Sequence, residues 1–219
     1  MELLDFARGP AIAFAGAVFV FGTLWRLVGV LLLPRLRDLS PARAGARAPW
    51  QSALRTIFVR MWPRKEFLPT TAFATVNSYV FHIGLAVVVF GLAPHILFIR
   101  GFSGLSWPSL PSNLVFAVGV VTLVSLLAAL ARRLTHPVLR LLSHGGDYLS
   151  WLLTALPVAT GLLATSHLGA RYETLLAVHL LSVAAFLIWF PFGKLMHAVL
   201  FAFSRGATGI RFGHRGVSV

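Results

Sequence analysis

Histidine is the residue whose placement in this chain points most directly to chemistry. The 219 residues include eight histidines and no cysteine. Four histidines lie within long apolar stretches, namely His82, His95, His179 and His197. An ionisable side chain inside a bilayer is costly and marks a functional site by default. A neutral imidazole offers a nitrogen lone pair to a metal ion without bringing a charge into that environment.

Two histidines on facing helices can bind the iron of one haem from both sides and bury its apolar macrocycle between the helices. His179 and His197 are 18 residues apart, which is five turns of an ideal helix, so we expect both on one face. The rise over this distance is about 27 Å, close to the thickness of the hydrocarbon core. The spacing therefore predicts one haem site towards each leaflet.

The composition predicts that these histidines are carried by membrane-spanning helices. The chain is 58% hydrophobic and 11% charged, whereas soluble domains are about 25% charged. A span needs roughly 20 apolar residues and must be helical in lipid. We therefore expect an all-α, polytopic bundle of five transmembrane helices, forming one membrane domain over residues 1–219. The predicted spans are 10–33, 72–99, 113–131, 148–167 and 175–203.

The basic residues predict how the bundle is oriented. The chain has 19 Lys and Arg against 6 Asp and Glu, a formal charge of +13. All but three of these cations sort to one side if Arg26 and Lys194 are placed there; the exceptions are Arg8, Arg100 and Arg171. The positive-inside rule then places the N-terminus outside and the C-terminus in the cytoplasm. We expect a multi-pass protein of the cell inner membrane, with a basic cytoplasmic loop over 34–71.

The middle of that loop, 52–62, mixes apolar residues with Arg55 and Arg60. This pattern is typical of an amphipathic interfacial helix or a docking surface. A solvated basic linker lying on anionic lipid is the alternative interpretation.

The orientation predicts the depth of each histidine in the membrane. His82 lies in the inner half of its span and His95 near the outer end, so depth pairs His82 with His197 and His95 with His179. The separation of 13 residues from His82 to His95 turns an ideal helix by about 220° beyond whole turns, so the two do not share a face. Pro94 precedes His95 directly and can redirect it by disrupting the helical hydrogen bonds.

A structural histidine, hydrogen-bonded between helices, is the competing interpretation for each of these four residues. It has most weight for His95, which lies close to the interface. His167, at the outer end of a span, is better explained as an interfacial side chain. The remaining histidines, His136, His144 and His214, lie among arginines in polar segments and are most simply solvated.

Three motifs carry a resemblance to a known family. They are A-G-A-V-F-V-F-G at 15–22, F-H-I-G at 81–84 and F-P-F-G-K-L-M-H at 190–197. On these motifs the chain resembles the respiratory nitrate reductase gamma-subunit family of di-haem cytochromes b. The resemblance covers all five spans. It implies two b haems, with quinone or quinol as the substrate.

The resemblance also implies ligands for each haem. Matching the motifs assigns His82 and His197 to the inner haem and His179 to the outer haem. The family's second outer ligand falls on Leu92, which cannot bind iron, and His95 is the natural substitute. Without His95 the protein would hold one haem. The family's quinol site is built partly around that missing histidine.

Further contacts are expected around the haems. Lys194 and Arg26 lie near the inner ends of their helices and are expected to contact haem propionates or lipid headgroups. The outer end of the bundle near His95, Arg100 and Trp107 is a possible site for a quinone headgroup.

The function expected from these features is that of an electron-transfer subunit without a complete active site of its own. It would pass electrons between the quinone pool and a redox subunit carrying iron–sulfur clusters or a catalytic metal centre. The chain has no cysteine for such clusters, and we expect no nucleic-acid partner. The W-P-S-L-P loop at 107–111 and the change at Leu92 and His95 favour the sulfur-metabolism or hydrogenase branches over a nitrate reductase. A proton-relay transporter and a non-redox membrane anchor are the alternatives.

Overall fold

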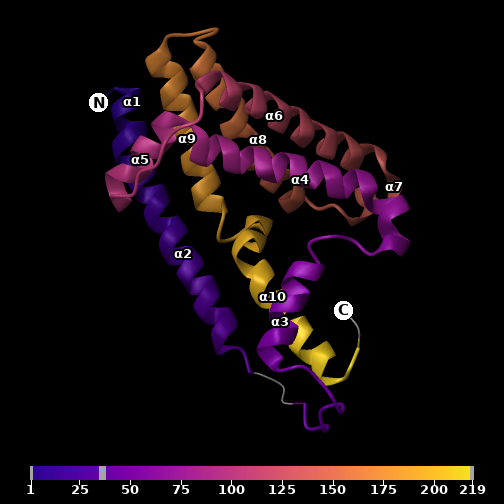
Figure 1. Ribbon diagram of the computed structural model, residues 1–219. Helices are drawn as coiled ribbons and strands as arrows, with labels where there is room; N and C mark the ends of the chain where they lie inside the picture. Colours follow the sequence, from indigo (N-terminus) through magenta and orange to yellow (C-terminus); the bar gives the residue numbers. More distant parts are fainter. Residues whose placement is uncertain (1, 35–37, 218–219) are drawn as a thin grey trace.

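A computed structural model describes residues 2–34 and 38–217, and the predicted loop residues Arg35 and Arg37 lie outside this range. The described residues contain helices and no strand (Figure 1). The α-helices are α1 (Leu3–Phe6), α2 (Ile12–Leu32), α3 (Pro49–Val59), α4 (Leu68–Gly91), α5 (Ala93–Ser103), α6 (Ser112–Thr135), α7 (Pro137–Leu142), α8 (Gly145–Ser166), α9 (Tyr172–Trp189) and α10 (His197–His214). A π-helix covers Ala7–Ala11, and 3₁₀ turns cover Lys65–Phe67 and Lys194–Met196.

Five helical segments of the described chain are long and apolar enough to cross a membrane. They are Leu3–Leu32, Lys65–Gly91, Ser112–Thr135, Gly145–Ser166 and Tyr172–Trp189. Many large apolar side chains on them are exposed, as with Phe21 at 72%. Exposed apolar surface of this extent is unfavourable in water but favourable in contact with lipid. The predictions of an all-α fold and of a multi-pass membrane protein are therefore confirmed.

The spanning helices pack in series rather than around one centre. α2 packs on α9, α9 on α8, α8 on α6 and α6 on α4. Within the described residues, α4 does not pack closely against α2 or α9, the helices that would close the ring. The series therefore forms an open arc with α4 at one end and α2 at the other (Figure 1).

Polar side chains link the packed helices. The Oγ of Ser125 in α6 donates to the backbone oxygen of Asn77 in α4 at 3.0 Å, and the Asn77 amide donates back to the Ser125 carbonyl. The indole N–H of Trp151 in α8 donates to the Leu126 carbonyl of α6 at 2.7 Å. In hydrocarbon such bonds join helices because no water competes for them.

The second predicted span is not continuous. The 72–99 helix predicted from sequence is instead α4, which begins at Leu68 and ends at Gly91, followed by an extended Leu92 with φ −81° and ψ 128°. α5 then begins at Ala93 in a new direction (Figure 1). In an uninterrupted helix the ring of Pro94 would clash with the carbonyl of Phe90, which explains the break.

The fifth predicted span is also interrupted. The helix predicted over 175–203 ends at Trp189, and α10 begins only at His197. Pro191 forces this break, and its buried ring lies against α2, where a Cβ on Gly22 would be 2.7 Å from the Pro191 Cγ. The expectation that His179 and His197 share one face of a single helix is therefore wrong.

Residues 49–59 of the predicted basic loop form a helix. α3 packs along α10 (Figure 1). Ser52 and Thr56 are buried against Gly209 and Gly213. Glycines allow this approach, because a Cβ on Gly213 would lie 2.7 Å from the Ser52 Cβ. The solvated-linker interpretation is wrong for this segment.

Candidate functional site

Two of the singled-out histidines face each other across the open side of the arc. His82 lies in the middle of α4 and His197 is the first residue of α10. Their ring centroids are 6.1 Å apart, with the ring planes at 89°. Both side chains are exposed although each lies among apolar residues. A group that occupies the space between them would cover both.

His95 and His179 form a second pair with the same separation between their rings. His95 lies in the first turn of α5 and His179 in the first half of α9. Their ring centroids are also 6.1 Å apart, but their planes differ by only 22°. The break at Leu92 turns His95 towards α9, which removes the phase conflict of an uninterrupted helix. The structure thus brings together the same two pairs that depth predicts from the sequence.

All four rings are held by the same nitrogen. The Nδ1 atoms of His82, His95 and His197 lie 2.7, 2.9 and 2.8 Å from the carbonyl oxygens of Ser78, Val88 and Lys194. The Nδ1 of His179 lies 3.2 Å from the Thr160 hydroxyl. A carbonyl only accepts, so Nδ1 carries the proton and Nε2 keeps its lone pair. This is the arrangement of metal-binding histidines.

The distance within each pair matches shared coordination of one metal ion. Two imidazole–metal bonds of about 2 Å, plus the distance from each nitrogen to its ring centre, place two centroids about 6.3 Å apart when the bonds are collinear. Both pairs are within a few tenths of this separation. Among the described residues there is no group of three or more His, Asp or Glu side chains that could hold a metal ion. The pairs therefore suit a metal whose remaining ligands come from a cofactor, as in haem.

Two residues of α8 position the second pair, and neither is predicted from the sequence. The Thr160 hydroxyl donates to the Leu156 carbonyl at 2.8 Å, so it is oriented to accept from His179. Gly161 allows the ring of His179 to lie against α8, because a Cβ there would lie 3.1 Å from Cε1. Hydroxyl side chains and glycines are common in apolar helices, so their spacing alone carries no signal.

Arg26, Lys194 and His197 line one hollow of about 660 Å³, together with aromatic side chains such as Trp189 and Phe201. The two cations predicted to contact haem propionates thus lie beside the His82–His197 pair. The Lys194 Nζ lies 2.5 Å from Oδ1 of Asp147, a buried carboxylate at the start of α8. Arg26 extends the positive lining from α2.

The three residues of the possible quinone site have different contacts in the structure. The Trp107 indole donates its N–H to the Phe90 carbonyl at 2.6 Å, capping the end of α4. Arg100 is exposed in the last turn of α5, and His95 belongs to the second pair. The indole N–H of Trp107 is therefore already used in a hydrogen bond to the backbone. It leaves Arg100 as the cation at this end of α5.

The other four histidines belong to neither pair. His136 and His144 precede α7 and α8, where His144 is 3.8 Å from Asp147. His167 ends α8 with φ 56°, and the Nε2 of His214 lies 2.9 Å from the Ser40 carbonyl.

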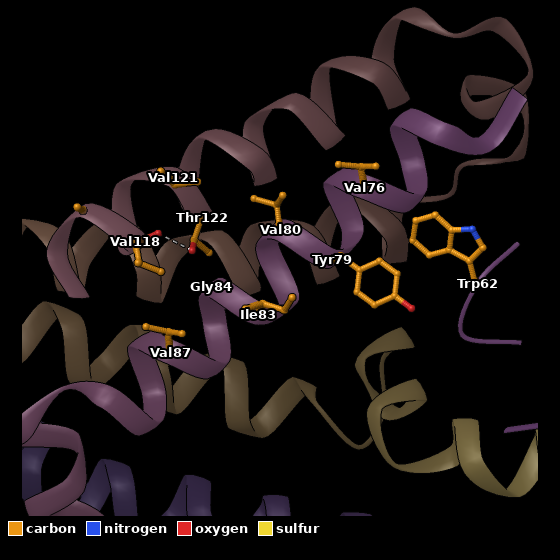
Figure 2. A pocket seen from close by; sticks show the side chains of 11 residues that line it. Trp62, Val76, Tyr79, Val80, Ile83, Gly84, Val87, Val118, Val121 and Thr122 are labelled. Atoms are coloured by element: carbon orange, nitrogen blue, oxygen red, sulfur yellow. Dashed lines mark hydrogen bonds between the residues drawn. The ribbon is translucent and has the colours of Figure 1, made fainter. Parts of the chain in front are cut away.

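A second hollow lies along α4 and α6. This groove of about 610 Å³ is lined by apolar side chains such as Val80, Ile83 and Val121, with Trp62 and Tyr79 at one end (Figure 2). The Trp62 and Tyr79 rings stack with centroids 6.0 Å apart. Its lining suits an acyl chain, and the histidine pairs do not contribute to it.

The fold and the two pairs define a class: a multi-pass helical membrane protein with paired histidines at two levels of its bundle. The chain belongs to the same family as a protein of Nitratidesulfovibrio vulgaris strain Hildenborough, whose name, "Protein", describes no activity. The two sequences are 32% identical over 197 residues, which cover 89% of this chain and 81% of that relative. No family model matches the chain.

Proposed function

We propose that this protein is a di-haem cytochrome b, a membrane subunit that passes electrons between the quinone pool and a redox partner subunit. The observation that carries the proposal is the geometry of the two histidine pairs. Each pair has ring centroids 6.1 Å apart, and in all four rings Nδ1 is occupied and Nε2 is free. If these histidines only joined helices by hydrogen bonds, the two pairs would not need the same ring separation and the same use of Nδ1.

The chain's own residues have separate tasks in this function. His82 and His197 would hold one haem, and His95 and His179 the other. Haem supplies reversible one-electron chemistry when it is bound. The groups that accept from Nδ1, three backbone carbonyls and the Thr160 hydroxyl, fix the ring planes and raise the basicity of Nε2. Arg26, in the hollow beside His197, is placed to balance the charge of haem propionates.

The charge distribution supports an orientation with the His82–His197 pair towards the cytoplasm. Arg26 and Lys194 lie beside this pair, and the basic helices α3 and α10 follow on the same side. The positive-inside rule then gives an outside N-terminus in the cell inner membrane. The basic cytoplasmic face favours an acidic docking face on the partner. Iron–sulfur clusters of the electron path would belong to that partner, since this chain has no cysteine.

The resemblance to nitrate reductase gamma subunits supports the same function and its quinone substrate. Leu92 stands where that family has a ligand, and the break at this residue supports His95 in its place. For the partner enzyme we propose a sulfur-metabolism or hydrogenase complex.

A haem count tests this function. The purified protein should give a b-type reduced-minus-oxidised spectrum, and a pyridine haemochrome assay should give two haems per chain. Absence of any b-type signal would reject the proposal in favour of a non-redox anchor or a transporter. One haem per chain would reject one of the two sites.

A further inference from the structure

Asp147 is the buried charged group for which the proposed electron path has no use. Its side chain is 7% exposed at the start of α8, in an otherwise uncharged helix. Oδ1 lies 2.5 Å from the Lys194 Nζ and 3.5 Å from an Arg133 Nη1, and Oδ2 accepts from the His144 backbone N–H at 3.0 Å. Burying a carboxylate is costly unless it is paired and hydrogen-bonded, so these contacts need an explanation.

Lys194 connects this carboxylate to a predicted ligand. Its carbonyl oxygen accepts from the Nδ1 of His197 at 2.8 Å, while its ammonium is held by Asp147. One residue thus contacts α8 through its side chain and the His197 imidazole through its backbone. Lys194 also opens the 3₁₀ turn that leads into α10.

The segment around Lys194 is attached to the bundle by the buried Met196 side chain and by the bond between Lys194 and Asp147. It follows the break at Pro191, so the helical hydrogen bonds of α9 do not extend to it. The Trp189 N–H donates to the Ser150 Oγ at 2.9 Å, which fixes the last turn of α9 on α8. The Asp147–Lys194 pair is the corresponding bond on the far side of the break.

We propose that Asp147 is a positioning residue for the inner haem: through Lys194 it sets the place and ring orientation of His197. This inference rests on the proposed haem function and deepens it. Loss of the carboxylate frees the Lys194 side chain, so the 194–196 turn loses its attachment to α8. The Lys194 carbonyl then no longer fixes the ring of His197 against His82.

The test uses Asp147→Asn and Lys194→Met in the full-length protein. Haem transfer to an excess of apomyoglobin measures haem retention, and low-spin EPR reports the orientation of the axial rings. Each variant should release one of its two haems about 10-fold faster than wild type, the usual effect of losing an outer-shell partner. The EPR signal of that same haem should shift, while the other haem stays unchanged and reports correct folding.

Two further variants complete the experiment. Asp147→Glu keeps the carboxylate and should restore most of the retention and the wild-type EPR signal. Glu173→Gln makes the same chemical change at an exposed carboxylate in the first turn of α9 and should change neither haem. Asp147→Asn with wild-type retention and EPR signals would overturn the inference, and so would equal weakening of both haems. A wild-type protein without haem would overturn the proposed function itself.

Discussion

At the scale of single residues, the hydrogen bond on Nδ1 decides what each imidazole can do. His82, His95 and His197 each donate to a backbone carbonyl, which cannot change its role. His179 donates to a hydroxyl instead, which itself donates to the Leu156 carbonyl. The His95–His179 pair therefore depends on one side chain that can be replaced.

Thr160→Val removes this acceptor at nearly constant volume. His179 then loses the partner that fixes its tautomer, so we expect the haem of the His95–His179 pair to be retained about 10-fold less tightly. Haem transfer to apomyoglobin measures this, and the His82–His197 haem should be unaffected.

Thr165→Val is the matched control. Thr165 lies in the same helix, is exposed, and its hydroxyl donates only to the Gly161 carbonyl within the described structure. Equal effects of the two substitutions would show that Thr160 acts through the helix rather than through His179.

At the scale of elements, proline breaks position one histidine of each pair. His95 follows the break at Leu92 and His197 follows the break at Pro191, whereas His82 and His179 lie within continuous helices. The first break also frees carbonyls at the end of α4. Val88 accepts from His95, and Phe90 accepts from Trp107. The break at Leu92 thus frees the Val88 carbonyl, which accepts the hydrogen bond that holds His95.

Trp107→Phe keeps the aromatic ring and removes the N–H that caps Phe90. The bond contributes about 1 kcal/mol, so the end of α4 should loosen and His95 with it. We expect a lower melting temperature and faster release of the His95–His179 haem.

Trp50→Phe makes the same change on α3, where Trp50 is 64% exposed. It should alter neither quantity. If Trp107→Phe behaves like this control, the cap has no part in holding His95.

The sequence predicts the number of spanning helices and the two histidine pairs, but not the way in which the second and fifth spans end. Helical hydropathy continues through Leu92 and Pro191, so hydropathy alone extends both helices too far. Proline signals a disturbance, yet the new direction depends on contacts made by distant residues such as Trp107 and Gly22.

At the scale of the whole molecule, the spanning helices form an open arc, and the histidine pairs connect α4 and α5, at one end of it, with α10 and α9. Neighbouring helices in the arc are joined by direct packing and by bonds such as Ser125 to Asn77. α4 instead meets α10 through the His82–His197 pair, and α5 meets α9 through the His95–His179 pair, each with ring centroids 6.1 Å apart. Burying two macrocycles there would complete the bundle, so we expect the haem-loaded form to be the stable one.

The packing of α3 on α10, and of Lys194 on Asp147, joins residues far apart in the chain. Periodicity within one segment carries no information about such contacts. The charge of +13 predicts an orientation but not these pairs.

Removing the four histidines one at a time tests the central claim most directly. Each alanine variant is purified, its haem is counted, and the EPR signal and midpoint potential of the remaining haem are recorded. His82→Ala and His197→Ala should each leave the same single haem, and His95→Ala and His179→Ala should each leave the other. Variants that divide in any other way, or that keep both haems, would contradict the two-pair arrangement.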